Sequence, residues 1–160
     1  MSELPSFDLH PRTRWDARFF QLTDLIASWS EDTSRKVGAV IVGEDQEIRS
    51  IGFNGLPRGV SASFPERFSR DGGEKYLWFE HAERNAIFNA ARFGAALNDC
   101  LIYSNLYPCA DCMRAIIQSG IKELRTYSPP PGEDYYRRSF EVSSTMASEA
   151  GLTVRYYERV

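Results

Sequence analysis

The chain has few of the features that mark a secreted or membrane protein. It holds only three cysteines in 160 residues, an odd number that argues against a disulfide framework and for a reducing compartment. No apolar run approaches the roughly 20 residues that are needed to cross a bilayer. The N-terminus also lacks the basic start and the apolar stretch of a signal peptide. We therefore expect a cytoplasmic protein that does not contact a membrane.

The chain also has no excess of positive charge. The formal net charge is −3 at pH 7, and lysine and arginine are scattered along the chain. Proteins that bind a polynucleotide along its backbone usually present a strongly basic surface. A small anionic ligand, in contrast, needs only a few local cations. The charge balance therefore disfavours DNA and RNA as partners and favours a free nucleotide.

The remaining composition is that of an ordinary globular protein, with 42% hydrophobic and 26% charged residues. A length of 160 residues is typical of one domain with a core of its own. We expect a single domain over residues 1–160, in which residues 1–13 form a surface arm.

The hydrophobic periodicity predicts an α/β arrangement. Apolar side chains recur every three or four residues from Trp15 to Trp29, which predicts one helix. Two apolar stretches, 37–42 and 48–53, predict a hairpin. The elements expected after them are a helix at 81–93, a strand at 100–105, a helix at 109–119, a strand at 124–127, a helix at 134–150 and a strand at 152–157. That order is typical of a sheet with helices on its faces. Residues 60–80 show no clear period, and such a stretch inside a compact domain is usually functional or an insertion.

Two short motifs combine metal-binding side chains with a carboxylate. They are His81-Ala82-Glu83 and a Pro-Cys-x-x-Cys pair formed by Cys109 and Cys112. Imidazole and thiolate suit Zn²⁺ in a tetrahedral arrangement, and three protein ligands leave the fourth position for water. Zinc lowers the pKa of that water from about 15.7 towards 7, and Glu83 can take its proton. This combination is the known signature of zinc-dependent nucleobase deaminases.

Two other interpretations of the cysteines stay open. A structural zinc site could use Cys100 as its fourth ligand, and the thiols could be small core residues. Cys100 begins an apolar run that extends to Tyr103, which favours a strand residue facing the core. We therefore expect an open site with Zn²⁺ as the cofactor.

The spacing of the motif residues poses a geometric question. Cys109 and Cys112 are i, i+3 neighbours in the first turn of an expected helix, where backbone N–H groups and the helix dipole lower the pKa of a thiol. His81 also opens a helix, but on a regular helix His81 and Glu83 would lie about 200° apart. Either the residue at the helix boundary departs from helical geometry, or Glu83 reaches round through its longer side chain.

These motifs and the stretches around them resemble the deoxycytidylate (dCMP) deaminases of the zinc-dependent cytidine deaminase superfamily. The similarity runs from about Trp15 to the C-terminus. The similar stretches are residues 34–42 (SRKVGAVIV), 52–59 (GFNGLPRG), 81–87 (HAERNAI), 108–112 (PCADC) and 117–122 (IQSGIK). The stretch 52–59 separates this chain from nucleoside deaminases better than the zinc residues do.

The resemblance implies a three-layer α-β-α cytidine-deaminase-like fold, an α/β fold in which a central mixed five-stranded sheet has helices on both faces. It also implies that His81, Cys109 and Cys112 bind Zn²⁺ and that Glu83 shuttles protons.

For the substrate, Asn54 matches the asparagine that hydrogen-bonds the nucleotide near its sugar, and Ala82 lies inside the zinc motif as a further candidate contact. A phosphate favours charge-assisted N–H donors. Arg35, Lys36 and Arg58 are therefore candidates for binding the 5′-phosphate.

Two further roles are expected from side-chain chemistry. A buried pyrimidine needs an apolar or aromatic wall, which Phe53, Phe79 or Tyr107 could supply. Arg92 follows Glu83 on the same expected helix and faces the nucleotide, a subunit interface or solvent.

The implied activity is hydrolytic deamination of dCMP to dUMP and ammonia. The alternative is a deaminase of another small nucleotide or nucleobase, such as a modified cytosine or a purine; a polynucleotide deaminase and a structural zinc module are disfavoured. Many relatives are hexameric, which implies a homo-oligomer. Val60 stands where many relatives have a cysteine, sometimes with further ligands for a second zinc ion, so we expect one metal ion in each chain.

Overall fold

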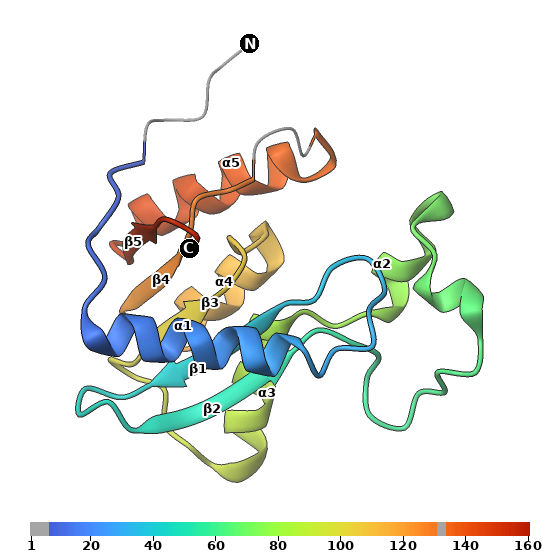
Figure 1. Cartoon of the computed structure of the whole chain (residues 1–160), viewed down its shortest axis with the longest axis horizontal. Helices are drawn as coiled ribbons and strands as arrows, with labels where there is room; N and C mark the ends of the chain where they lie inside the picture. Colours follow the sequence, from blue (N-terminus) through green and yellow to red (C-terminus); the bar gives the residue numbers. More distant parts are fainter. Residues whose placement is uncertain (1–6, 131–133) are drawn as a thin grey trace.

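The computed structural model of the chain describes residues 7–130 and 134–160. Within these ranges the chain forms a five-stranded sheet with the strand order β2-β1-β3-β4-β5 (Figure 1). β1 pairs antiparallel with β2 and β3, whereas β4 pairs parallel with β3 and β5. The sheet is therefore mixed, as the family resemblance implies. The strands are β1 (Gly38–Val42), β2 (Ile48–Phe53), β3 (Leu101–Ser104), β4 (Glu123–Tyr127) and β5 (Thr153–Tyr157).

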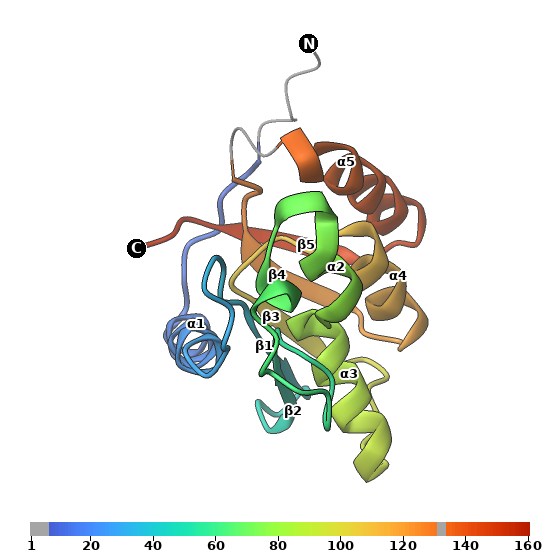
Figure 2. The ribbon, with the colours of Figure 1, turned by 90° about the vertical axis from the view of Figure 1, so that its right-hand side faces the viewer.

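Helices cover both faces of the sheet, which gives three layers (Figure 2). The longer helices are α1 (Arg14–Ala27), α3 (Ala82–Phe93), α4 (Ala110–Gln118) and α5 (Asp134–Glu149). α1 packs on one face, and α3, α4 and α5 pack on the other. The expected α-β-α arrangement is therefore confirmed. None of the helices in the described ranges is long and apolar enough to cross a bilayer.

The central strand β1 supplies side chains to two hydrophobic cores. Ala39 and Ile41 face the core beneath α3 and α4, whereas Val40 and Val42 face the core beneath α1. All five residues of β1 are buried. A strand that is covered on both faces must be apolar at every position, which explains the continuous apolar run in the sequence.

Two glycines let helices approach the sheet closely. A Cβ atom at Gly38 would collide with the backbone oxygen of Thr23 in α1, and one at Gly52 would collide with the backbone nitrogen of Ala86 in α3. A glycine in a strand often marks such a close approach of other backbone. The contact at Gly52 fixes α3, and with it the first of the two metal-binding motifs, against β2.

The first helix is shorter than the sequence predicts. α1 ends at Ala27, so Trp29 lies beyond it and is half exposed, and Trp15 is also exposed. Asp16 is instead buried, because its carboxylate forms a capping box with Thr13 and an ion pair with Arg125. The buried face of α1 therefore includes a polar side chain, that of Asp16. The pattern of apolar residues in the sequence does not predict its burial.

Residues 60–80, here called the outer segment, project from one end of the sheet (Figure 1). They contain two short 3₁₀ helices, Pro65–Phe68 and Asp71–Gly73, followed by α2 (Glu74–Trp78). At the base of the segment, Gly55 and Glu80 form an isolated β-bridge. A region without periodicity in the sequence thus consists of short elements that follow one another closely.

The described part of the expected arm runs along β5. The ring of Phe7 lies 4.5 Å from the ring of Tyr156, and the backbone N–H of His10 donates to the Tyr156 carbonyl over 2.8 Å. The remaining residues of the arm, 1–6, lie outside the described ranges.

Candidate metal centre and active site

His81 and Cys109 hold equivalent places at the starts of two helices. His81 is the N-cap of α3 and Cys109 is the N-cap of α4. Both have extended backbones, with φ −84° and ψ 155° at His81 and φ −68° and ψ 172° at Cys109. His81 therefore does not follow the helical rotation that would turn it away from Glu83. The boundary residue departs from helical geometry, which answers the question raised by the spacing.

The three expected metal ligands form one compact cluster. Nδ1 of His81 lies 3.4 Å from Sγ of Cys109 and 3.4 Å from Sγ of Cys112, and the three donor atoms lie within 4.8 Å of one another. A tetrahedral zinc ion with Zn–S near 2.3 Å and Zn–N near 2.0–2.1 Å places sulfur and nitrogen about 3.5 Å apart. The donor set and its spacing therefore fit zinc.

Cys100 lies outside this cluster. It is buried directly before β3, and its Sγ donates to the carbonyl of Ala96 over 3.8 Å. Within the described ranges, the potential metal-ligand group does not include it. The structure thus gives no support to a closed site with Cys100 as a fourth ligand, and it confirms Cys100 as a core residue.

Glu83 is buried beside the metal ligands. Cys112 Sγ donates to Glu83 Oε2 over 3.4 Å, and Ser104 Oγ donates to Oε1 over 3.4 Å. Burial raises the pKa of Glu83 above its ordinary value of 4.5, although the charge of His81 opposes this effect. The carboxylate is therefore oriented by two donors, and its proton affinity is increased.

The two thiols of the cluster have very different acidities. Hydrogen bonds from Cys112 and His81 lower the pKa of Cys109 to about 4, although burial opposes them. Burial raises the pKa of the Cys112 thiol well above 9. A bound cation deprotonates a coordinating thiol. The positive charge of a metal ion would therefore stabilise the thiolate of Cys112, which burial alone disfavours.

The starts of α3 and α4 are also connected by charged groups outside the cluster. Glu80 Oε1 accepts the backbone N–H of His81 over 2.9 Å and Nε of Arg84 over 2.5 Å. Arg84 Nη1 in turn lies 3.7 Å from Oδ2 of Asp111 in α4. This chain of contacts holds the two helix starts together, and contacts of this kind orient metal ligands.

A pocket of about 530 Å³, including its open mouth, has His81 and Cys109 in its lining. Its walls come from the loops before β1 and after β2, the outer segment, the loop after β3, and α5. The other lining residues are Asp32, Arg35, Val37, Asn54, Arg70, Lys75, Tyr76, Phe79, Leu106, Tyr107, Tyr136 and Phe140. Charged groups and aromatic rings thus share the space above the metal cluster.

Comparison with known proteins agrees with this site. Residues 13–128 match the family described as the cytidine and deoxycytidylate deaminase zinc-binding region. The chain belongs to this family. A deoxycytidylate deaminase of Mus musculus is 36% identical over 148 residues, which cover 89% of this chain and 79% of that protein. A protein of Aliivibrio fischeri described as an uncharacterized deaminase in the luxG 3′ region is 43% identical over 148 residues, covering 90% of this chain and 94% of its own.

A solved structure shows the same fold. The crystal structure of dCMP deaminase from the cyanophage S-TIM5, in complex with dCMP and dUMP, aligns with a TM-score of 0.76 at 23% identity. The alignment covers 92% of this chain and 99% of that chain. This deaminase thus has the family fold, and its zinc site consists of His81, Cys109 and Cys112.

The structure places two of the expected substrate contacts, Asn54 and Ala82, differently. Asn54 lines the pocket, where its Oδ1 accepts the N–H of Val37 over 2.8 Å and its Nδ2 donates to Asp32 and to the carbonyl of Arg35 over 3.0 and 2.9 Å. A carbonyl oxygen can accept a second hydrogen bond, so Asn54 Oδ1 retains one place for a ligand. Ala82 is fully buried in the core beneath α3.

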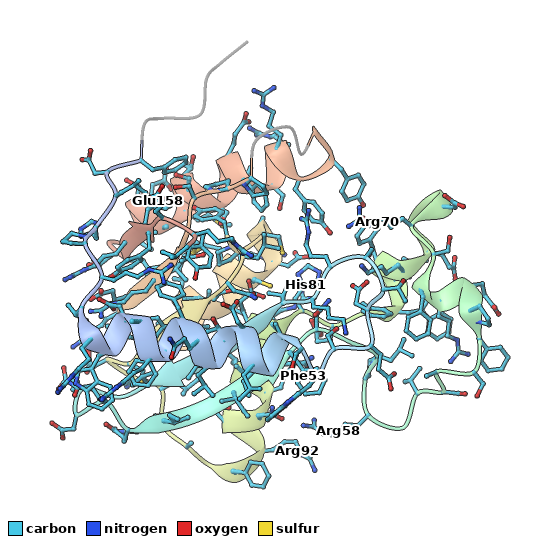
Figure 3. The ribbon with its side chains drawn as sticks, in the orientation of Figure 1. Phe53, Arg58, Arg70, His81, Arg92 and Glu158 are labelled. Carbon is cyan, nitrogen blue, oxygen red and sulfur yellow. The ribbon has the colours of Figure 1, made fainter. Side chains whose placement is uncertain are left out.

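The structure separates the three cations that the sequence groups together. Arg35 lines the pocket above the metal cluster, and Lys36 lines a neighbouring hollow that also contains Arg35. Arg58 instead donates to Oδ1 of Asn89 in α3 and is absent from the pocket lining. In Figure 3 both Arg58 and Arg92 lie below His81, near the end of α3.

The outer segment supplies residues that the sequence analysis did not single out. Arg70, Lys75 and Tyr76 line the pocket, together with Tyr136 of α5. The length of the segment indicates a functional role, but no local pattern distinguishes these side chains from surface residues. Among the expected aromatic walls, Phe79 and Tyr107 line the pocket, whereas Phe53 packs edge-on against Trp29 with a centroid distance of 6.1 Å.

Proposed function

We propose that this deaminase hydrolyses dCMP to dUMP and ammonia. The observation that carries the proposal is the similarity to deoxycytidylate deaminases over most of the chain, such as the 36% identity to the mouse protein across 89% of this chain. The pocket supports it, because cations lie in its wall and His81 and Cys109 also line it. Deoxycytidylate has a phosphate for the cations and an aminated ring for the metal centre.

The chemistry is a proton relay through Glu83. When bound, zinc supplies a Lewis acid that makes hydroxide available near neutral pH. Glu83 takes a proton from water, the hydroxide adds to C4 of the cytosine ring, and Glu83 delivers the proton to N3. Glu83 then carries the proton of the new hydroxyl to the exocyclic amine. The C4–N bond breaks, a C4 carbonyl forms and ammonia leaves.

The surroundings of Glu83 suit this double role. A group that accepts and donates protons in one cycle works best when its pKa lies near the working pH. Burial raises the pKa of Glu83 in that direction. Ser104 Oγ donates to one carboxylate oxygen over 3.4 Å, so the side chain is held next to the cluster while it exchanges protons, whereas the Cys112 thiol loses its proton when it binds zinc.

The walls of the pocket match the other parts of the nucleotide. Phe79 and Tyr107 are nearly fully buried and offer apolar surface to the pyrimidine ring. Asn54 lies in the wall as the candidate partner of the sugar, and Arg35 is the candidate partner of the 5′-phosphate. We also propose one catalytic domain in the cytoplasm, assembled into the homo-oligomer, a hexamer, that the family resemblance implies.

A second candidate is a deaminase of another small nucleotide, with a modified cytosine or a purine base. The Aliivibrio fischeri relative at 43% identity is described only as a deaminase, so similarity to it agrees with either candidate. The two candidates would differ in their contacts with the base and the phosphate, not in the metal ligands. The pocket residues of the outer segment, such as Arg70 and Tyr76, are therefore where a different substrate preference would arise.

The experiment that tests the proposal is a side-by-side assay of ammonia release. Purified enzyme with quantified zinc is offered dCMP, CMP, dCTP, deoxycytidine and GMP. We expect the highest kcat/KM with dCMP and a clear loss with deoxycytidine, which has no phosphate. A preference for a purine or for the free nucleoside would contradict the proposal.

A further inference from the structure

The outer segment holds a buried charge. In residues 60–80, Lys75 and Phe79 are the two buried residues, with exposed fractions of 6% and 7%. Lysine is almost never fully buried unless its ammonium group is paired. The burial of Lys75 therefore requires a partner in the body of the protein.

That partner is Asp32, in the loop before β1. Lys75 Nζ forms an ion pair with Asp32 Oδ2, and the exposed fractions of the two side chains are 7% and 1%. Lys75 Nζ also donates to Ser34 Oγ over 2.8 Å. Asp32 Oδ1 accepts the backbone N–H groups of Ser34 and Arg35 over 2.8 and 3.2 Å. The ammonium group is thus enclosed by the folded loop that carries Arg35.

The same carboxylate reaches the loop after β2. Nδ2 of Asn54 donates to Asp32 Oδ2 over 3.0 Å. Asp32 therefore joins the outer segment to the two loops that present the candidate substrate contacts Arg35 and Asn54. Asp32, Lys75, Arg35 and Asn54 all line the pocket.

On its other side, the outer segment contacts α5 through aromatic rings. Tyr76 stacks on Tyr135 with a centroid distance of 4.9 Å and meets Tyr136 edge-on at 6.0 Å. Arg70 precedes α2 and also lines the pocket, and Figure 3 shows it on the outer side of the site beyond His81. The segment is therefore held on one side of the pocket by the Lys75–Asp32 ion pair and on the other by the contact of Tyr76 with α5.

We propose that the Lys75–Asp32 ion pair is a positioning device that holds the outer segment across the pocket, so that Arg70 and Tyr76 form one wall of the substrate site. A buried charge pair specifies a single arrangement, because displacement leaves both charges unpaired in a poorly solvated place. The inference rests on the proposed function, since the substrate is the probe of the wall.

The first test separates binding from chemistry. Lys75→Met keeps an unbranched side chain that is one heavy atom shorter, and it removes the charge. We expect the KM for dCMP to rise about tenfold while kcat changes less than about threefold, because the metal ligands and Glu83 are untouched. Zinc content should equal that of the parent. A fall in kcat at unchanged KM, or unchanged kinetics, would overturn the proposal.

Control variants distinguish the pair from the loss of any lysine or of stability. Lys122 also forms an ion pair with a carboxylate, that of Glu44, but both side chains are exposed, so Lys122→Met should leave kcat and KM unchanged. The double variant Asp32→Asn/Lys75→Met should be no worse than Asp32→Asn alone, because the two side chains act as a unit. Additive increases in KM would contradict a positioning pair.

A second test needs no substrate. Trypsin cleaves after Arg67 and Arg70, both in the outer segment, and cleavage there should be faster in Lys75→Met and Asp32→Asn than in the parent or in Lys122→Met. If Lys75→Met does not fold, Asp32→Asn carries both measurements with the same expectations. Equal cleavage rates would overturn the positioning role. Faster cleavage in Lys75→Met and Asp32→Asn, together with a parent chain that does not deaminate dCMP, would leave the positioning role standing and refute the proposed function.

Discussion

The metal centre and the outer segment are built by opposite means. The metal ligands lie at two helix starts, where the backbone of His81 and Cys109 is fixed by the cap position and the sheet lies directly behind. The outer segment consists of short elements with two buried residues, and Lys75 connects it to Ser34, 41 residues away in the sequence. In the proposed function, chemistry rests on local structure at two helix starts, whereas recognition rests on a few long-range contacts. Substitutions in one region should therefore affect kcat, and substitutions in the other should affect KM.

The largest effect is expected at the metal centre. Cys112→Ser removes a thiolate ligand whose sulfur lies 3.4 Å from Nδ1 of His81. We expect loss of bound zinc and of all measurable turnover, because two remaining ligands hold the ion poorly. Metal analysis together with ammonia release checks this result. If Cys112→Ser kept both its zinc and its turnover, Cys112 would not be an essential metal ligand, and the contrast between the two regions would fail.

A large effect on stability, but not on recognition, is expected on the opposite face of the sheet. Asp16 accepts from Tyr103 and Arg125 over 2.9 and 2.7 Å. Asp16→Asn leaves Arg125 with one carboxylate partner, Glu123, and should lower the free energy of unfolding by about 3 kcal/mol. Denaturant unfolding at pH 7 measures this change, and the KM for dCMP should stay unchanged in the folded variant.

The same carboxylate predicts a pH dependence. Burial would raise the pKa of Asp16, but hydrogen bonds from Thr13, Tyr103 and Arg125 outweigh it and lower the pKa below 3.8. Because the pKa is lower in the folded chain, the stabilisation is fully present above about pH 4 and is lost as the pH falls through the folded pKa. The parent should therefore lose stability more steeply than Asp16→Asn below pH 4. Parallel curves would show that the carboxylate does not stabilise the fold.

A moderate effect is expected in the outer segment. Arg70→Gln removes a second cation, besides Arg35, from the pocket wall, and the KM for dCMP should rise about tenfold because the wall attracts the phosphate less strongly. The KM for deoxycytidine should not change. Arg58→Gln is the matched control, since Arg58 contacts Asn89 outside the pocket. Equal effects of the two variants on KM would place the phosphate elsewhere.

The smallest effect is expected at the third cysteine. Cys100→Ser exchanges a buried thiol that donates to Ala96 and takes no part in the metal cluster. Zinc content and kcat should remain those of the parent, with a change in unfolding free energy of about 1 kcal/mol. Release of zinc would restore the closed structural site as an explanation.

Local rules in the sequence were sufficient for the fold and the metal centre. A continuous apolar run predicts the buried strand from Gly38 to Val42, and the two motifs predict the cluster of His81, Cys109 and Cys112, because helix starts and i, i+3 spacing are properties of neighbouring residues. The departure of His81 from helical geometry is also a local feature, although the spacing alone left two solutions.

The rest depends on contacts between distant parts of the chain. No pattern near Asp16 predicts that its carboxylate pairs with Arg125 and is buried. For the same reason, the apolar spacing wrongly predicts that Trp15 and Trp29 belong to the buried face of the first helix. The partnership of Lys75 with Asp32 is likewise invisible in the sequence, because any lysine of a polar stretch is expected to be solvated. Long-range ion pairs are therefore the part of this structure that sequence patterns do not predict.

The most direct test of the account concerns Glu83. The parent and Glu83→Gln are loaded to equal zinc content, and the release of ammonia from dCMP is followed under the same conditions. The account predicts that the variant retains zinc and binds dCMP, while kcat falls by about 10²–10⁴-fold because the proton relay is lost. Turnover by Glu83→Gln at the rate of the parent would contradict the central role of this carboxylate.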